Sequence, residues 1–411
     1  MRKNKPAKLS RIHVKGLVLL ITCFLLLHSP SWAIPQKPLK PGTSQKVIII
    51  MMDGFGINYY RNSNMPNLNK IEKSGIYKSV TSLMPSVTNL NNTSICTGTL
   101  PIVHGITGNS FVNPATGNEE FMEEDSLVLA PTIFERAQKK GIHSLLFSSK
   151  KKTTGLLFKG SDEAISPETA SKKWIDLVGT PPSIYSREVN YWLLNAAIYS
   201  MQHNPTIDLF YIHTTDYPMH TWAPEEKESK EHLHTLDSLI GRMMEILPNA
   251  VILLTADHHV NHKSFCWDIE KALAKRNISI KMAISPERDK YFKHHRGFGG
   301  TSYVYLKDSS DRARVIQGIK QLKGVDEVIT RQEAVKRFHL MPARIGDLVV
   351  LGDSTTVFGD LDTENEVLPA NYRSHGSLYE AKVPLFMYNT PPVIKPSVIQ
   401  YNYQIAKWLY N

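Results

Sequence analysis

The sequence of 411 residues predicts an α/β fold in which a mostly parallel central sheet is covered by helices on both faces. Three short apolar runs are the main evidence, at residues 47–52, 209–212 and 251–254. Runs that are uniformly apolar over so few residues are typical of strands buried on both faces. Polar residues follow each run almost at once, at the strand ends where such sheets bind their ligands.

Acids and histidines are the polar residues that follow these runs: Asp53; Asp216 and His220; Asp257 and His258. Because the carboxyl ends of parallel strands meet at one edge of a sheet, we expect these side chains to converge there. Carboxylate oxygens mixed with imidazole nitrogens suit zinc or manganese better than calcium. One acid at a strand end is often only a helix N-cap, but three such positions with paired histidines predict a metal site.

The first 33 residues have the pattern of a cleaved secretory signal. Six basic residues precede an apolar stretch at 16–27, which is shorter than the ~20 residues of a membrane span. Small residues then stand at the expected cleavage positions, in Ser31-Trp32-Ala33. An uncleaved anchor and an acylation site at Cys23 are the alternatives. We expect a secreted or periplasmic protein without a membrane span after the signal is removed.

The formal net charge of +10 falls to +4 once the six basic residues of the signal are gone. No nucleic-acid partner is therefore expected. Only Cys96 and Cys266 remain in the mature chain, too few for a disulfide framework even in an oxidising compartment. The fold must depend on its apolar core.

The mature chain is larger than a single core usually supports, so we expect an inserted region. Short strand patterns and a helical stretch at 312–322 follow the third apolar run, and they predict a small α+β cap over the site. The expected divisions are a signal peptide at 1–33, a Pro-rich and Lys-rich linker at 34–45, catalytic core at 46–262, the inserted cap at 263–343, and core again at 344–411.

A second informative stretch covers residues 84–109. Its Pro-Ser-Val-Thr turn leads into a segment at 89–97 that can form a helix, which would place Thr88 at the helix N-terminus. Free N–H groups and the positive end of the helix dipole favour an anion there. Threonine needs activation to act as a nucleophile, and metal coordination can supply it. Thr88 is a candidate nucleophile, with a simple N-cap as the alternative.

These motifs stand in a characteristic order: Asp53, PSVT at 85–88, TGTLPIVHGITGN at 97–109, DYPMH at 216–220, TADHH at 255–259 and RSHGS at 373–377. The order resembles the alkaline phosphatase superfamily, in its branch with nucleotide pyrophosphatase/phosphodiesterases and phosphonoacetate hydrolases. Within that branch, residues 88–92, 108–111 and 344–350 most closely resemble phosphonoacetate hydrolase. The resemblance implies a three-layer alkaline-phosphatase-like core.

The resemblance also implies two zinc ions, with manganese or another divalent ion as an alternative. One ion would be held by Asp216, His220 and His375. The other would be held by Asp53, Asp257 and His258, with the Thr88 oxygen as fourth ligand. Thr88 would attack phosphorus and form a phosphothreonine intermediate, which water then hydrolyses. Asn109 resembles the amide donor that stabilises charge on the phosphoryl group.

The substrate implied by the resemblance is phosphonoacetate, cleaved at its C–P bond to acetate and phosphate. Lys150 lies where a lysine would grip the substrate carboxylate. The family's second lysine has no clear counterpart, since Lys227 and Lys230 follow His220 without matching it. The main alternative is a periplasmic phosphodiesterase or nucleotide pyrophosphatase with the same metal site.

Two other classes of function are considered: a binding protein, which remains an alternative, and a sulfatase, which fits less well. A binding protein on the same scaffold would keep a phosphate-like ligand without turnover. A sulfatase would need a C-x-P-x-R motif, which the sequence lacks. Histidines outside the implied ligand set are interpreted as loop residues: His259, His262, His294 and His295.

Overall fold

The computed structural model describes residues 45–291, 293–391 and 394–410. The predicted signal peptide and all of the predicted linker except Gln45 lie outside these residues. The lobe built on the large sheet is called the large lobe below. The smaller sheets between residues 261 and 367 form the small lobe.

A seven-stranded sheet is the centre of the large lobe. Its order is β2 (Ile76–Thr81), β18 (Lys382–Tyr388), β8 (Val251–Thr255), β1 (Val47–Met51), β7 (Ile207–His213), β5 (His143–Ser148) and β6 (Glu163–Ile165). β1 pairs in parallel with β7 and β8, and β5 pairs in parallel with β7 and β6. β18 runs antiparallel to both of its neighbours. The predicted mostly parallel central sheet is confirmed.

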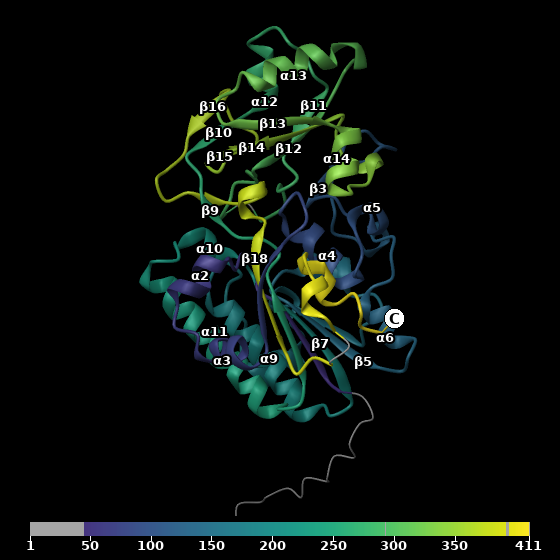
Figure 1. Cartoon of the computed structure of the whole chain (residues 1–411), viewed down its shortest axis with the longest axis vertical. Helices are drawn as coiled ribbons and strands as arrows, with labels where there is room; N and C mark the ends of the chain where they lie inside the picture. The colour runs from purple at the N-terminus through teal and green to yellow at the C-terminus, as the bar shows by residue number, and fades with distance from the viewer. Residues whose placement is uncertain (1–44, 292, 392–393, 411) are drawn as a thin grey trace, which may run out of the picture. The chain divides into compact units, whose positions relative to one another are not determined.

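Helices cover both faces of this sheet, which gives three layers (Figure 1). One layer contains α2 (Ile57–Asn62), α3 (Pro66–Ser74), α9 (Glu188–His203) and α11 (Lys227–Ile246), and the other contains α4 (Thr88–Thr97), α6 (Ile133–Gln138) and α7 (Lys151–Leu157). In α11 the buried residues Leu233, Leu236 and Ile240 recur at helical spacing, so one face of the helix packs inward. Every residue of β1 is buried, as its uniformly apolar sequence predicts.

The small lobe contains two further sheets (Figure 1). One has the order β11 (Met282–Ile284), β12 (Thr301–Tyr305), β14 (Leu348–Gly352) and β13 (Val325–Thr330), and the other has β15 (Thr356–Phe358), β10 (Phe265–Trp267) and β16 (Asn365–Val367). Its helices are α12 (Ile269–Ala274), α13 (Arg312–Lys320) and α14 (Arg331–Phe338). β14 pairs with β12 and β13, so the sheet extends past residue 343. The proposed division at 343 stays a prediction.

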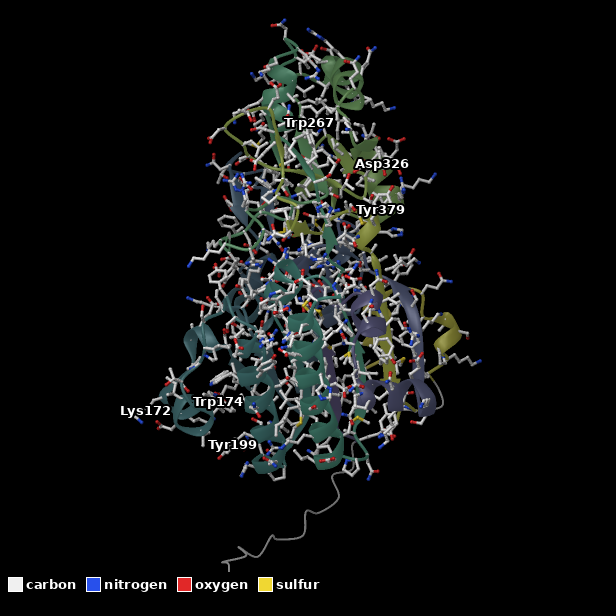
Figure 2. The ribbon with its side chains drawn as sticks, turned by 90° about the vertical axis from the view of Figure 1, so that its left-hand side faces the viewer. Lys172, Trp174, Tyr199, Trp267, Asp326 and Tyr379 are labelled. Carbon is white, nitrogen blue, oxygen red and sulfur yellow. The ribbon has the colours of Figure 1, made fainter. Side chains whose placement is uncertain are left out.

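Figure 2 labels Trp267, Asp326 and Tyr379 in and beside the small lobe, and Trp174 in the large lobe. The Tyr379 hydroxyl donates to Asp326 Oδ2 at 2.7 Å, which ties the segment before β18 to β13. Trp174 packs edge-to-face on Phe147 of β5.

Short elements complete the described chain. The remaining helices and strands are β3 (Ser110–Val112), β4 (Glu119–Phe121), α5 (Pro101–His104), α8 (Lys172–Val178), α10 (Tyr217–Thr221), β9 (Asn261–His262) and β17 (Arg373–Ser374). Among the residues that the structure describes, none of the helices has both the length and the apolar character needed to cross a membrane. Cys96 and Cys266 are free and buried.

Candidate metal centre

Three neighbouring strands bring the predicted acids together. β1 lies between β7 and β8, and Met51 at its end stands opposite His213 and Thr255. Asp53, Asp216 and Asp257 follow these strands by two or three residues, and each carboxylate is at most 1% exposed. Because the three strand ends are in register, residues some 200 positions apart in sequence meet at one edge of the sheet.

The first group, called the Asp53 cluster, consists of Asp53, Asp257, His258 and Thr88. His258 Nε2 lies 3.3 Å from Asp53 Oδ1, 3.3 Å from Asp257 Oδ2 and 3.4 Å from Thr88 Oγ1. Ligands about 2.0–2.1 Å from a tetrahedral zinc lie roughly 3.3–3.4 Å from one another. Asp53 Oδ1 and Asp257 Oδ2 are buried and accept no hydrogen bond from the described residues. The cluster therefore has buried donors at a spacing that could hold a divalent metal ion.

Backbone N–H groups turn Asp257 toward this cluster. Its Oδ1 accepts from Gly54 N–H at 3.1 Å and from His258 N–H at 2.9 Å, which leaves Oδ2 facing the other ligands. Gly54 has φ of +73°, and a side chain there would meet the Asp216 Cβ at 3.1 Å. A glycine directly after Asp53 is needed for both reasons.

The second group, called the Asp216 cluster, consists of Asp216, His220 and His375. Asp216 Oδ2 lies 2.9 Å from His220 Nε2 and 3.6 Å from His375 Nε2. One turn of α10 separates Asp216 from His220, whereas His375 arrives just after β17. The two clusters adjoin, because the ligand atoms of Asp216, His258 and His375 all lie within 4.8 Å of one another.

All three imidazoles present Nε2 to the clusters. In each ring Nδ1 donates its proton to a backbone carbonyl, so Nε2 is the nitrogen that can bind a metal. The donor and acceptor pairs are His220 to Arg373 at 2.7 Å, His258 to His259 at 3.1 Å and His375 to Ser86 at 2.9 Å. Burial lowers the pKa of His220 and of His258, which keeps these rings neutral and able to bind a metal. In His375 burial opposes the charged form, but the adjacent Glu287 and Asp216 carboxylates outweigh it and raise the pKa well above its usual value, so a metal would replace the Nε2 proton of that ring.

Burial and mutual proximity shift the pKa values of the three carboxylic acids. Burial and the adjacent Asp53 raise the pKa of Asp257 well above its usual value. Burial also opposes ionisation of Asp53 and Asp216, but Lys150 and nearby imidazoles outweigh it and hold the pKa of each well below the usual range. Divalent ions in the two clusters would neutralise this concentration of negative charge.

Thr88 is the first residue of α4, and Val87 occupies the N-cap position. Thr88 is therefore not the N-cap, and its Oγ1 lies 3.4 Å from His258 Nε2. Asn109 lies beside the same helix start: its Oδ1 accepts from Asn89 N–H at 3.1 Å, and its Nδ2 donates to Glu287 O at 3.0 Å. The amide of Asn109 is therefore held next to Thr88.

Two of the three consecutive lysines are buried in the site. Lys150 Nζ donates to Asp216 Oδ1 at 2.8 Å and to Asp53 Oδ2 at 3.1 Å, and the residue is 4% exposed. Lys152 is also buried and pairs with Asp289, whereas Lys151 between them is exposed. The sequence interpretation missed Lys152, because a run of lysines resembles ordinary solvated surface. Lys227 and Lys230, considered as the second lysine, are exposed on α11.

Four more side chains that the sequence interpretation did not assign to the site lie beside the clusters. His213 Nε2 is 3.1 Å from Asp53 Oδ2, and Glu287 Oε1 is 3.2 Å from His375 Nε2. The loop between β11 and β12 also brings His294 and His295 there, with His294 Nε2 3.7 Å from Asp216 Oδ1. For His294 and His295, the sequence feature that could have indicated a place in the site is the pair of adjacent histidines in a loop rich in glycine.

The other two histidines interpreted as loop residues do not belong to the two clusters, and His262 lies in the short strand β9 rather than in a loop. His259 packs edge-to-face on Tyr59, and its ring occupies the space beside Gly56. His262 is exposed in β9.

The three-layer fold and the buried Asp/His clusters define the class of protein: a hydrolase of the alkaline phosphatase superfamily, in which dependence on metal ions is typical. More specifically, the chain belongs to the type I phosphodiesterase / nucleotide pyrophosphatase family, whose model matches residues 47–378.

A structural relative covers nearly the whole chain. Phosphonoacetate hydrolase from Sinorhizobium meliloti 1021, solved in complex with phosphonoacetate, superposes with a TM-score of 0.81 at 29% identity, over 89% of this chain and 95% of that one. Human ectonucleotide pyrophosphatase / phosphodiesterase 5 superposes with a TM-score of 0.61 at 15% identity, over 84% of this chain and 88% of that one, and shares the fold.

Curated relatives match only part of their own length. The human bis(5'-adenosyl)-triphosphatase ENPP4 is 26% identical over 225 residues, which are 52% of this chain and 47% of that protein. The venom phosphodiesterase CdcPDE of Crotalus durissus collilineatus is 28% identical over 236 residues, 52% of this chain and 26% of that one. The matches thus span half or less of these two relatives.

Proposed function

We propose that the chain is a secreted di-zinc hydrolase that cleaves the C–P bond of phosphonoacetate to acetate and phosphate. The observation that carries this proposal is the pair of adjoining clusters, with a threonine hydroxyl in one of them and two buried lysines beside them. The similarity to phosphonoacetate hydrolase over 95% of that chain supports it. The predicted signal at residues 1–33 supports export to the periplasm or outside the cell.

The metal ions would be held by the two clusters already defined. Asp216, His220 and His375 would hold one ion, and Asp53, Asp257, His258 and Thr88 the other. The fit rests on the inward Nε2 atoms and on the buried carboxylate oxygens without hydrogen-bond partners in the described chain. Bound zinc, or manganese in its place, would neutralise charge on the phosphoryl oxygens and activate the nucleophile.

Thr88 is proposed as the nucleophile. The Thr88 oxygen forms a bond to phosphorus while the C–P bond breaks. The electron pair of the C–P bond stays on carbon, which takes up a proton to give acetate. Water then hydrolyses the phosphothreonine and releases phosphate. The Asn109 amide, and the N–H groups at the start of α4 other than that of Asn89, would stabilise negative charge on the phosphoryl oxygens during both steps.

Lys150 and Lys152 are proposed to favour a substrate that carries a carboxylate beside its phosphonate. Both ammonium groups are buried, and both already pair with carboxylates: Lys150 with Asp53 and Asp216, Lys152 with Asp289. With metal ions on Asp53 and Asp216, the Lys150 ammonium would be free to pair with the carboxylate of a small anionic substrate. Lys150 is the lysine that the sequence resemblance implied for this role, and Lys152 is a second candidate.

Phosphate release by the purified mature protein loaded with zinc tests this function. Phosphate released from phosphonoacetate would be compared with nitrophenolate released from a nitrophenyl phosphodiester, whose hydrolysis leaves a phosphate monoester rather than free phosphate, with Thr88→Ala as control. A preference for phosphonoacetate above ~100-fold in kcat/KM, about 2.7 kcal/mol of transition-state discrimination, is expected. A preference for the diester would contradict C–P cleavage, and turnover that survives in Thr88→Ala would exclude the proposed nucleophile.

A phosphodiesterase or nucleotide pyrophosphatase is the second candidate, because the matched family carries that description. Aromatic rings next to the Asp216 cluster favour it. Tyr217 lies 6.0 Å from Tyr185, 6.4 Å from Trp222 and 6.1 Å from His294, measured between ring centroids. Such rings can pack against a nucleobase or another aromatic leaving group. The diester arm of the same assay tests this candidate.

A further inference from the structure

A buried arginine lies two residues before the ligand His375. Arg373 is 9% exposed, and its side chain donates to three oxygens. Nε donates to Met219 O at 2.9 Å, and Nη2 donates to Val260 O at 2.6 Å and to the Tyr59 hydroxyl at 3.1 Å. These acceptors are two carbonyls and a phenol oxygen rather than a carboxylate, so forming an ion pair does not explain why this charge is buried.

Both carbonyls that Arg373 contacts lie in segments that carry a proposed ligand. Met219 directly precedes His220 in α10, and Val260 follows His258 by two residues. The carbonyl of Arg373 itself accepts the Nδ1 proton of His220 at 2.7 Å. One residue therefore holds the segments of all three histidines, two through its guanidinium group and one through the backbone that continues to His375.

Tyr59 reinforces this arrangement from α2. Its hydroxyl accepts from Arg373 and lies 2.9 Å from Met219 O and 2.7 Å from Trp222 O. The guanidinium carbon of Arg373 lies 5.8 Å from the centre of the Tyr59 ring. The middle of α10 and its C-cap residue are thereby held by Tyr59 and Arg373.

We propose that Arg373 is a positioning residue that sets the relative placement of His220, His258 and His375, and thereby the affinity of both metal positions. Histidine ligands depend on the acceptor bound to their other ring nitrogen, and the loss of such outer contacts typically costs 10–100-fold in metal affinity. This inference rests on one part of the proposed function, namely that His220, His258 and His375 bind the metal ions. It does not depend on the substrate.

For zinc affinity, the planar geometry of the Arg373 guanidinium group should matter more than its positive charge. Arg presents donors in a rigid planar fork, whereas Lys offers a single mobile ammonium that cannot reach all three acceptors in the same way. Arg373→Met is expected to weaken zinc binding by ~10–100-fold, and Arg373→Lys is expected to remain at least ~5-fold weaker than the wild type.

Arg344→Met is the matched control. Arg344 is also part-buried and donates to carbonyls, those of Gly105 at 2.8 Å and Leu127 at 2.7 Å, but it contacts no proposed ligand within the described residues. It should lose stability in the same way and keep zinc affinity within ~3-fold of the wild type.

Zinc affinity would be measured by competition with a chromophoric chelator, and ligand geometry by the visible absorption of the cobalt(II) protein. Urea unfolding in EDTA would verify that each variant is folded. If Arg373→Met does not fold, Tyr59→Phe removes the shared hydroxyl and should weaken zinc binding by at least ~3-fold.

The proposal is overturned if Arg373→Met, or Tyr59→Phe in its place, keeps wild-type zinc affinity and cobalt spectrum. It is equally overturned if Arg344→Met loses as much affinity. Failure of the proposed function would look different: the wild type would bind two zinc ions, respond to Arg373→Met as expected, and release no phosphate from phosphonoacetate.

Discussion

Lys150 provides the sharpest test of how charge is balanced in the metal centre. Its ammonium is buried between Asp53 Oδ2 and Asp216 Oδ1, while the other oxygen of each carboxylate faces its imidazole ligand. Lys150→Met keeps a similar side-chain length and removes this cation. The resulting loss in the free energy of unfolding should depend strongly on whether zinc is bound.

The magnitude follows from the burial of the three groups. Removing one partner of a buried ion pair costs about 3–5 kcal/mol, because the remaining charge stays uncompensated. That loss is expected in protein stripped of metal. With zinc on both carboxylates the loss should shrink to about 1–2 kcal/mol, because the metal supplies the missing positive charge. By linkage, the difference of roughly 2–3 kcal/mol corresponds to ~30- to 150-fold tighter zinc binding by the variant.

Urea unfolding in EDTA and in saturating zinc measures the two losses, and chelator competition measures zinc affinity directly. Lys152→Met is the matched control two residues further along the chain, since it breaks a buried pair with Asp289, which is not a proposed ligand. It should lose similar stability with and without zinc. Equal losses for Lys150→Met under both conditions, or weaker zinc binding, would refute the reasoning.

Two further predictions concern Asn109 and His104. Asn109→Ala should lower kcat for phosphate release by ~10²–10³-fold with KM within ~3-fold, because it removes a donor to developing charge; a change confined to KM in steady-state assays would contradict this role. Burial, aided by Arg344, lowers the pKa of His104 to about 3 in the folded protein, so below pH ~6.5 the unfolded chain binds the extra proton and stability falls as pH falls. Between pH 7 and pH 5 the free energy of unfolding should fall by about 2 kcal/mol less in His104→Gln than in the wild type, as measured by urea unfolding in EDTA. An equal fall in both proteins would contradict this role of His104.

The strands and most of the implied ligands could be predicted because their signals are local. Residues 47–51 are apolar without interruption, which leaves few alternatives to a strand buried on both faces. Asp53 follows that strand by two residues, so its position at the sheet edge follows from the strand itself. His375 is different, because only the RSHGS resemblance connected it to acids far away in sequence.

Contacts that depend on distant partners could not be predicted. Lys150, Lys151 and Lys152 are chemically identical, and burial of the first and third depends on where Asp53, Asp216 and Asp289 lie in space. Likewise β14 joins strands on both sides of residue 343, and long-range pairing of this kind leaves no local pattern.

The two clusters differ in how much of the chain must be in place before they are complete. The ligands of the Asp53 cluster all precede β9, and they stand just after β1, just after β8 and at the start of α4. The Asp216 cluster needs His375, which the chain reaches only after it has passed through the small lobe and returned along β17. One metal position therefore draws only on segments that precede the small lobe, whereas the other also needs a segment that follows it. Insertions in the small lobe should leave both unchanged as long as the chain returns along β9.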